Sequence, residues 1–189
     1  MISTNASVDL VLPVGQRDRT QGFITAPIVL VEYGDYQCPY CAQAVDIVRE
    51  LQHSLGVGEA SLKENRLCYV FRHFPLTELH PRAMRAAEAA EAAAAQNQFW
   101  QMHYRLFEYQ SAFSEQDLLQ YASSLKLDVD RFQHDLNNKH QLHHIQEDMR
   151  TGVDSGVNST PTFFINGIHY FDSWDLNTLM NTIKQRYPQ

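Results

Sequence analysis

The sequence contains few cysteines, no long apolar run and no excess of basic residues. Three cysteines in 189 residues are too few for a small scaffold held together by disulfides. No segment approaches the roughly 18 consecutive apolar residues that a membrane-spanning helix needs. Fifteen Lys and Arg against 22 Asp and Glu give a formal net charge of −7, whereas binding to nucleic acid requires a dense basic face. We therefore expect neither a membrane span nor a nucleic-acid partner.

The N-terminal residues are not expected to form a secretory signal. Residues 1–9 read MISTNASVD, without the basic residues and the apolar core of such a signal. We therefore expect a cytoplasmic protein, or a periplasmic or secreted one if a signal has been removed. With 44% hydrophobic and 20% charged residues, the chain can bury a core and does not have the composition of a disordered protein. Its length is typical of one globular domain with one elaboration.

Two short apolar runs on either side of a helical pattern predict a βαβ unit. Residues 28–33 and 67–71 are rich in β-branched and aromatic residues, as buried strands are. Between these runs, apolar residues recur with helical spacing at Ala44, Ile47, Val48 and Leu51. Strand, helix and strand in this order are typical of a parallel pair.

From about residue 79 to 149 the composition changes to helix formers. Helices are predicted over 82–96, from 99 onward, after Ser114, after Asp128, and from His140 to a stop near Gly152. A block of this length is too long to be a loop. Three of its residues are expected in the core of the helical block, namely Trp100, Met102 and Tyr104.

The C-terminal part returns to strands. Asn166-Gly167 separates the apolar runs 162–165 and 168–171 and is a strong hairpin signal. Asp175 then caps a last helix with an apolar face. The predicted order is βαβ, a helical block and ββα, which is an α/β fold.

Cys38 and Cys41 are placed for redox chemistry. Pro39 suits the first position of the predicted helix, so the cysteines lie one turn apart at its N-terminus, close enough for a disulfide. The positive end of the helix dipole favours the thiolate of Cys38, and the thiolate is the attacking species. Cys41 suits the resolving thiol, which attacks a mixed disulfide and releases the substrate. A Cys-x-x-Cys between a strand and its helix is typical of a dithiol redox site.

Other metal-ligating side chains give weaker signals. A structural zinc site needs four ligands, and the sequence has no second Cys-x-x-Cys, so we expect no metal. Cys68 is predicted to be a buried core thiol. His140, His143 and His144 offer an i, i+4 pair but are expected on a solvated helix face. His73, near a strand end, is expected at the surface, with a position facing the active site as the alternative.

Three segments resemble the DsbA-like thioredoxin-fold oxidoreductases. They are EYGDYQCPYC at 32–41, STPTFFING at 159–167 and FRHFPL at 71–76. In that family a helical insertion separates the two halves of a thioredoxin fold. The resemblance implies a thioredoxin-like domain formed by 27–76 and 152–189 and an inserted helical subdomain at 77–151. Residues 1–26 carry little of this resemblance, and their proline, glycines and mixed charges predict an irregular N-terminal segment.

The resemblance also implies roles for residues outside the cysteine pair. In this fold a cis proline, here Pro161, lies against the pair, and its neighbour Thr160 offers backbone groups to an extended substrate. From the residues alone, a trans proline starting an edge strand is an equal interpretation. The family places a buried carboxylate, here Glu32, beneath the resolving cysteine, where a raised pKa suits proton transfer; an exposed edge position is the alternative. The expected substrate contacts are Pro39, Tyr40, Thr160 and Pro161.

We therefore expect a protein disulfide oxidoreductase, which exchanges disulfides with protein or peptide thiols. No cofactor is expected, because the dithiol itself carries two electrons, and the recycling partner could be glutathione or a thioredoxin system. Tyr40 cannot supply the positive charge of a histidine, so Cys38 is expected to be less acidic than in the strongest oxidants of this fold. The direction of electron flow is left open.

Three other functions are left open as well. A glutathione-dependent reductase would share Cys-Pro-Tyr-Cys with glutaredoxins, although their glycine pair after the cis proline is missing here. A kappa-type transferase or isomerase has this architecture but normally lacks the second cysteine. A non-catalytic peptide-binding or chaperone module could use an apolar groove around the pair.

Overall fold

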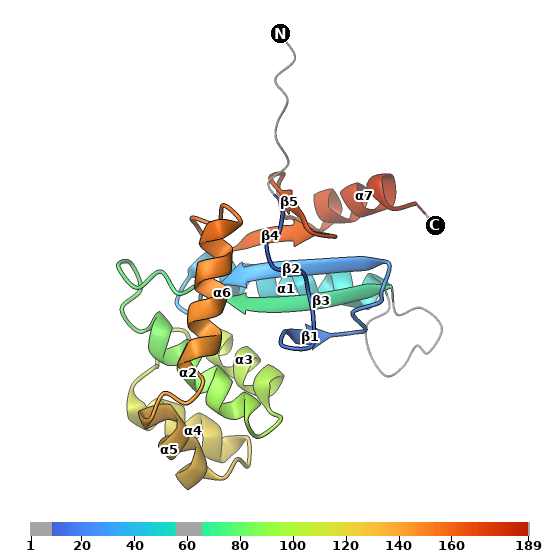
Figure 1. Cartoon of the computed structure of the whole chain (residues 1–189). Coiled ribbons are helices and arrows are strands. Elements are labelled where there is room, and N and C mark those ends of the chain that lie inside the picture. The colour runs from blue at the N-terminus through green and yellow to red at the C-terminus, as the bar shows by residue number, and fades with distance from the viewer. Residues whose placement is uncertain (1–8, 56–65, 189) are drawn as a thin grey trace.

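The computed structural model describes residues 9–55 and 66–188, which build a mixed sheet with helices on both faces (Figure 1). Residues 1–8, on which the expected absence of a secretory signal mainly depends, lie outside the described residues. The five strands lie in the order β1-β3-β2-β4-β5. Their bounds are β1 (Arg19–Gln21), β2 (Ile28–Gly34), β3 (Leu67–His73), β4 (Thr162–Ile165) and β5 (Ile168–Tyr170).

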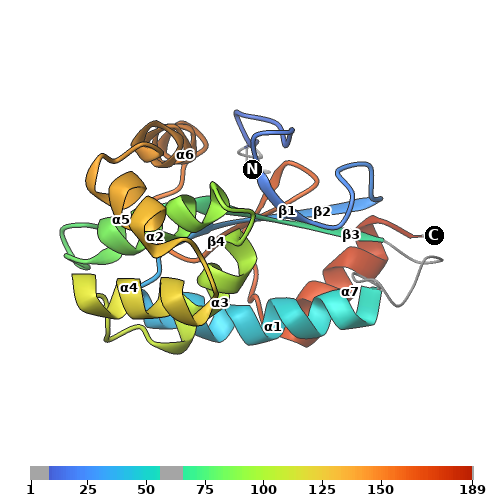
Figure 2. The same ribbon diagram turned by 90° about the horizontal axis from the view of Figure 1, so that it is seen from below.

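The central strands form the predicted βαβ and ββ units. β2 and β3 are parallel, with α1 (Pro39–Leu55) between them in the sequence, and β4 runs antiparallel to both β2 and β5. α1 and α7 (Leu176–Arg186) cover one face of the sheet, whereas α6 (Leu142–Asp154) lies on the other (Figure 2). The expected α/β class and thioredoxin-like order of elements are confirmed.

Four further helices lie beside the ends of β2 and β3 (Figure 1). They are α2 (Ala83–Ala94), α3 (Phe99–Glu108), α4 (Glu115–Ser124) and α5 (Val129–Asn137). The side chains of Ser114 and Asp128 cap α4 and α5 by accepting backbone N–H groups of the first turns. Met102 is fully buried, and Trp100 and Tyr104 pack against the core as expected. Among the described residues, no helix is long and apolar enough to cross a membrane.

One expectation about the course of the chain is wrong and another is confirmed. The first 26 residues are not wholly irregular, because Arg19–Gln21 form β1, which pairs antiparallel with β3 at the edge of the sheet. The predicted end of the last inserted helix near Gly152 is confirmed, since α6 ends at Asp154. A Cβ atom at Gly152 would lie 2.8 Å from the ring of Phe74 and 2.9 Å from that of Tyr33. This glycine therefore permits α6 to pack closely on the sheet.

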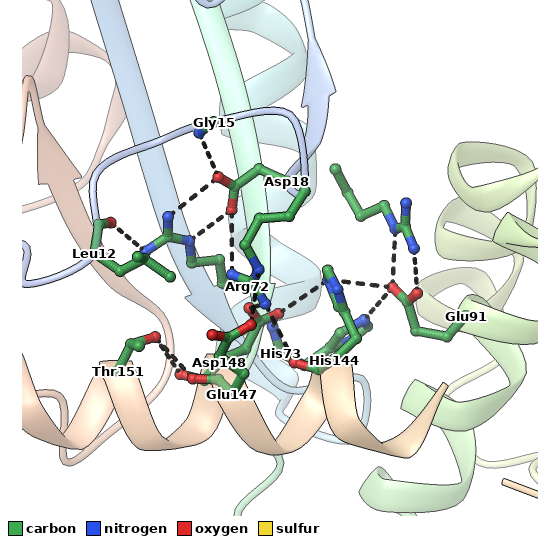
Figure 3. A network of polar contacts seen from close by, with 12 residues as sticks. Leu12, Gly15, Asp18, Arg72, His73, Glu91, His144, Glu147, Asp148 and Thr151 are labelled. Carbon is green, nitrogen blue, oxygen red and sulfur yellow. Dashed lines mark hydrogen bonds and ion pairs between the residues drawn. The ribbon is translucent and has the colours of Figure 1, made fainter. Parts of the chain in front are cut away.

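A buried polar network joins the N-terminal segment, β3, α2 and α6 (Figure 3). At its centre, the fully buried Arg72 donates from Nε to Asp18 Oδ1 at 2.8 Å. The same guanidinium donates from Nη1 to the carbonyl of Leu12 at 2.9 Å and to the hydroxyl of Tyr33 at 3.0 Å. The carboxylate of Asp18 also accepts the backbone N–H of Gly15 at 2.8 Å. The buried ion pair thereby fixes the N-terminal segment on the sheet.

His73 belongs to this network and not to the surface. It is buried, with Nε2 3.0 Å from Glu91 Oε1 and its backbone N–H donating to Asp148. Burial opposes ionisation of Glu91, but contacts with His73 and Arg19 outweigh it and hold its pKa well below the ordinary value. His144 is buried here too, so only two of the three histidines expected on a solvated face, His140 and His143, are exposed.

We predict that Arg72→Met lowers the free energy of unfolding by about 3 kcal/mol, because Asp18 then stays buried without its main cationic partner. Chemical denaturation of the two proteins measures the difference. The matched control is Arg150→Met, which breaks an exposed ion pair with Asp154 and should cost no more than about 1 kcal/mol. Equal losses in both variants would contradict the structural role of the buried pair.

Candidate active site

The turn between β2 and α1 places the two cysteines at the helix N-terminus. β2 ends at Gly34 and α1 begins at Pro39, where the missing N–H of proline costs no helical hydrogen bond. Cys38 keeps 4% of its surface exposed, whereas Cys41 is fully buried. Pro39 and Tyr40 beside them are exposed. A partner molecule therefore reaches Cys38 before Cys41.

Hydrogen bonds stabilise the thiolate of Cys38. The thiol of Cys41 donates to its sulfur and has the largest effect, Thr160 contributes next, and the backbone N–H groups of Cys41 and Tyr40 also donate. Against the opposing effect of burial, these contacts lower the pKa of Cys38 to about 5. In the protonated form, Cys38 Sγ donates to the carbonyl of Thr160 at 3.3 Å. At neutral pH the donors prevail, and Cys38 is a thiolate.

Burial has the opposite effect on Cys41. Loss of hydration raises the pKa of its thiol well above the ordinary value, and both the hydrogen bond to Cys38 and the charge of Glu32 raise it further. One donor opposes this shift, the backbone N–H of Asp35, which lies 3.5 Å from Cys41 Sγ. The two thiols thus differ in charge at neutral pH, with Cys38 ionised and Cys41 protonated.

Glu32 is a fully buried carboxyl group on β2. Burial raises its pKa to about 8, the charge of Cys38 adds to the increase, and the hydroxyl of Tyr69, which donates to Oε2 at 2.7 Å, opposes it. Oε1 has no hydrogen-bond partner among the described residues. A carboxyl group with a pKa near neutrality and one free oxygen can exchange a proton at physiological pH.

The segment before β4 faces the cysteines. The peptide bond between Thr160 and Pro161 is cis, and the carbonyl of Thr160 is the group that accepts the Cys38 thiol. Thr160 is buried. The fold therefore brings four predicted site residues together around the two sulfur atoms, although they lie up to 128 residues apart in the sequence. They are Glu32, Cys38, Cys41 and Thr160.

Asp35 is not among the predicted site residues, yet it fixes the turn. Its buried carboxylate accepts the backbone N–H of Gln37 at 2.7 Å and that of Leu76 at 2.8 Å, and His80 Nδ1 lies 2.8 Å from it. Its backbone carbonyl accepts the N–H of Cys38 at 3.1 Å. An acidic residue in the turn before a Cys-x-x-Cys was the available sequence signal, since aspartate commonly accepts backbone N–H groups two residues on.

Residues after β3 also anchor the turn, and no sequence signal points to them. Gln110, beyond α3, donates from Nε2 to the carbonyls of Tyr36 and Cys38, both at 2.8 Å. The hydroxyl of Tyr36 lies 3.1 Å from Nδ1 of the buried His103 in α3. The inserted helices therefore hold the cysteine turn directly.

Comparisons with known proteins agree with this architecture. A family model described as thioredoxin matches residues 15–185. Among solved structures, oxidised BdbD from Bacillus subtilis superposes with a TM-score of 0.79 at 22% identity, covering 98% of this chain and 100% of that one. Wolbachia pipientis alpha-DsbA1 superposes with a TM-score of 0.74 at 22% identity, covering 96% of both chains. The DsbA-like fold expected from the resemblance is confirmed.

Curated relatives that match the chain carry the name of a Na(+)/H(+) antiporter, not of an oxidoreductase. The Na(+)/H(+) antiporter NhaA 3 of Salinispora tropica is 41% identical over 181 residues, which make up 95% of this chain and 26% of the relative. The chain thus spans about a quarter of the length of the curated relatives it matches.

We predict that Glu32→Gln removes a pH dependence of stability. Because burial, the largest cause of the shift, raises the pKa of Glu32 in the folded protein above that of an unfolded chain, the wild type loses stability as the pH rises between about 5 and 8. In Glu32→Gln this loss should shrink by a few kcal/mol. Denaturation across this pH range, with the Cys38–Cys41 disulfide formed so that neither thiol titrates, measures it.

The exposed Glu78 provides the matched control, because Glu78→Gln should leave the pH dependence unchanged. If the stability of Glu32→Gln follows the same pH dependence as that of the wild type, Glu32 does not have a raised pKa.

Proposed function

We propose that this chain, which belongs to the thioredoxin family, is a thiol–disulfide oxidoreductase acting through Cys38 and Cys41. The opposite pKa shifts of two thiols one helical turn apart support this proposal most directly. A low pKa makes Cys38 the nucleophile at neutral pH. A high pKa keeps Cys41 protonated, so that it does not attack until it loses its proton in the second step.

In the first step, the thiolate of Cys38 attacks a disulfide of the substrate. The substrate S–S bond breaks, a mixed disulfide with Cys38 forms, and one substrate thiolate leaves. We propose that the substrate lies extended along Thr160 and Pro161, with Pro39 and Tyr40 as its other contacts. Tyr40 is 59% exposed, so it presents an aromatic surface beside the reacting sulfur.

In the second step, Cys41 loses its proton and attacks the sulfur of Cys38. The mixed disulfide breaks, the Cys38–Cys41 disulfide forms, and the second substrate thiolate leaves, so two electrons pass from the chain to the substrate. Glu32 is the proposed acceptor of the Cys41 proton. The charge of Cys38, which adds to the raised pKa of Glu32, is lost in the mixed disulfide, so Glu32 can release its own proton and then take up that of Cys41. With the chain oxidised at the start, the same steps run in reverse.

The proposed substrates are protein or peptide thiols and disulfides. The dithiol supplies both electrons, so the exchange requires no cofactor, and glutathione or a thioredoxin system is the proposed recycling partner.

We also propose that the chain divides into a thioredoxin-like domain at 27–76 and 152–189 and an inserted helical subdomain at 77–151. A cytoplasmic location stays a prediction.

The function is tested by trapping the mixed disulfide. Cys41→Ser, incubated with a peptide carrying a disulfide, should accumulate a covalent adduct on Cys38 that mass spectrometry detects, because resolution is blocked. Wild type should turn over without the adduct, and Cys38→Ser should form none. Cys68→Ser is the matched control, since Cys68 is fully buried as predicted, and it should behave as wild type. If Cys38→Ser retained the biological activity of the chain, a non-catalytic binding role would replace this proposal.

A further inference from the structure

A cluster of metal-ligating side chains lies away from the cysteine site, where α5 ends and the chain turns towards α6. His134 and Asp135 belong to the last turn of α5, and His140 follows in the connection. One ligand atom from each residue lies within 4.8 Å of the others. Because three ligands around one zinc ion at roughly 2.0–2.2 Å lie within about 4 Å of one another, small side-chain movements suffice to close the site.

The backbone holds these three residues together. Lys139 adopts a left-handed conformation with φ 52°, which reverses the chain after α5. The N–H of His140 then donates to the carbonyl of Asp135 at 3.2 Å. The rings of His134 and His140 meet edge to face with centroids 5.2 Å apart, and His140 Nδ1 lies 2.9 Å from Asp135 Oδ1. The ligands are therefore arranged before any ion binds.

We propose that His134, Asp135 and His140 form a surface site for a late first-row divalent cation, with Zn²⁺ as the probe. Two imidazoles and a carboxylate are a ligand set that zinc accepts, with water in the fourth position. From the sequence, His140, His143 and His144 offer an i, i+4 pair that we expect on a solvated helix face, with no metal; in the structure the buried His144 lies in the polar network. The turn instead brings His140 to the end of α5.

One positive charge competes with the ion. Arg131 Nε lies 3.7 Å from Asp135 Oδ2, on the carboxylate oxygen that does not face His140. A bound cation would repel this guanidinium, so the competing charge lowers the affinity without removing a ligand. Arg131→Gln should therefore bind Zn²⁺ several-fold more tightly than the wild type.

Titration calorimetry with Zn²⁺ tests the site. The chain is used with its Cys38–Cys41 disulfide formed, so that these thiols cannot bind the ion, and the result is independent of whether the proposed redox function holds. One equivalent should bind with a micromolar dissociation constant, and His134→Ala and His140→Ala should each weaken binding by about 10-fold or more. The matched control is His143→Ala, an exposed histidine outside the cluster, which should leave the affinity unchanged.

Folding of the variants is checked by their thermal unfolding without metal. Zn²⁺ should raise the unfolding temperature of the wild type, because an ion that binds only the folded chain stabilises it, and it should raise that of His140→Ala less. The proposal is overturned if no binding is seen at about 100 µM Zn²⁺, or if His143→Ala weakens binding as much as His134→Ala does.

Discussion

The charge on the sulfur of Cys38 is the feature on which the rest of the site depends. Donors from Cys41 and from the first turn of α1 stabilise the thiolate, while burial keeps Cys41 and Glu32 protonated near neutral pH. Of the three neighbouring ionisable groups, Cys38 is therefore ionised near neutral pH, whereas Cys41 and Glu32 are neutral. This arrangement orders the proposed reaction, because Cys38 is the thiol that attacks first, and Glu32 can take up the proton of Cys41 once the charge of Cys38 is lost in the mixed disulfide.

The donors stabilise the thiolate only if the turn keeps its shape, and several elements outside α1 hold it. Asp35 ties the turn to the segment after β3 through backbone N–H groups and His80. Gln110 ties it to the end of α3. The inserted helical block thus contributes directly to the site, because it supplies hydrogen-bond partners to the turn that carries both cysteines. The buried ion pair of Arg72 and Asp18 fixes the N-terminal segment on β3.

Local signals in the sequence predict most of the fold and part of the site. These signals act within a few residues: Pro39 at the start of a helix, Asn166-Gly167 in a hairpin, and the capping residues of other helices. The elements that they predict are observed. Burial of His73 could not be predicted, because it depends on Glu91 in α2 and Asp148 in α6. The contact of Gln110 with the turn likewise depends on how α3 packs. Side-chain partners supplied by distant helices leave no periodic pattern in the chain.

The reduction potential of the Cys38–Cys41 pair tests the central claim most directly. A stabilised Cys38 thiolate stabilises the reduced form, and a pKa of about 5 lies between those of thioredoxin, about 7, and DsbA, about 3.5. Equilibration in glutathione buffers, with the oxidised fraction read by thiol labelling and mass, should give a potential between those of DsbA and thioredoxin, about −120 and −270 mV. A potential at or below about −270 mV, or a pair that forms no disulfide in any buffer, would contradict the account.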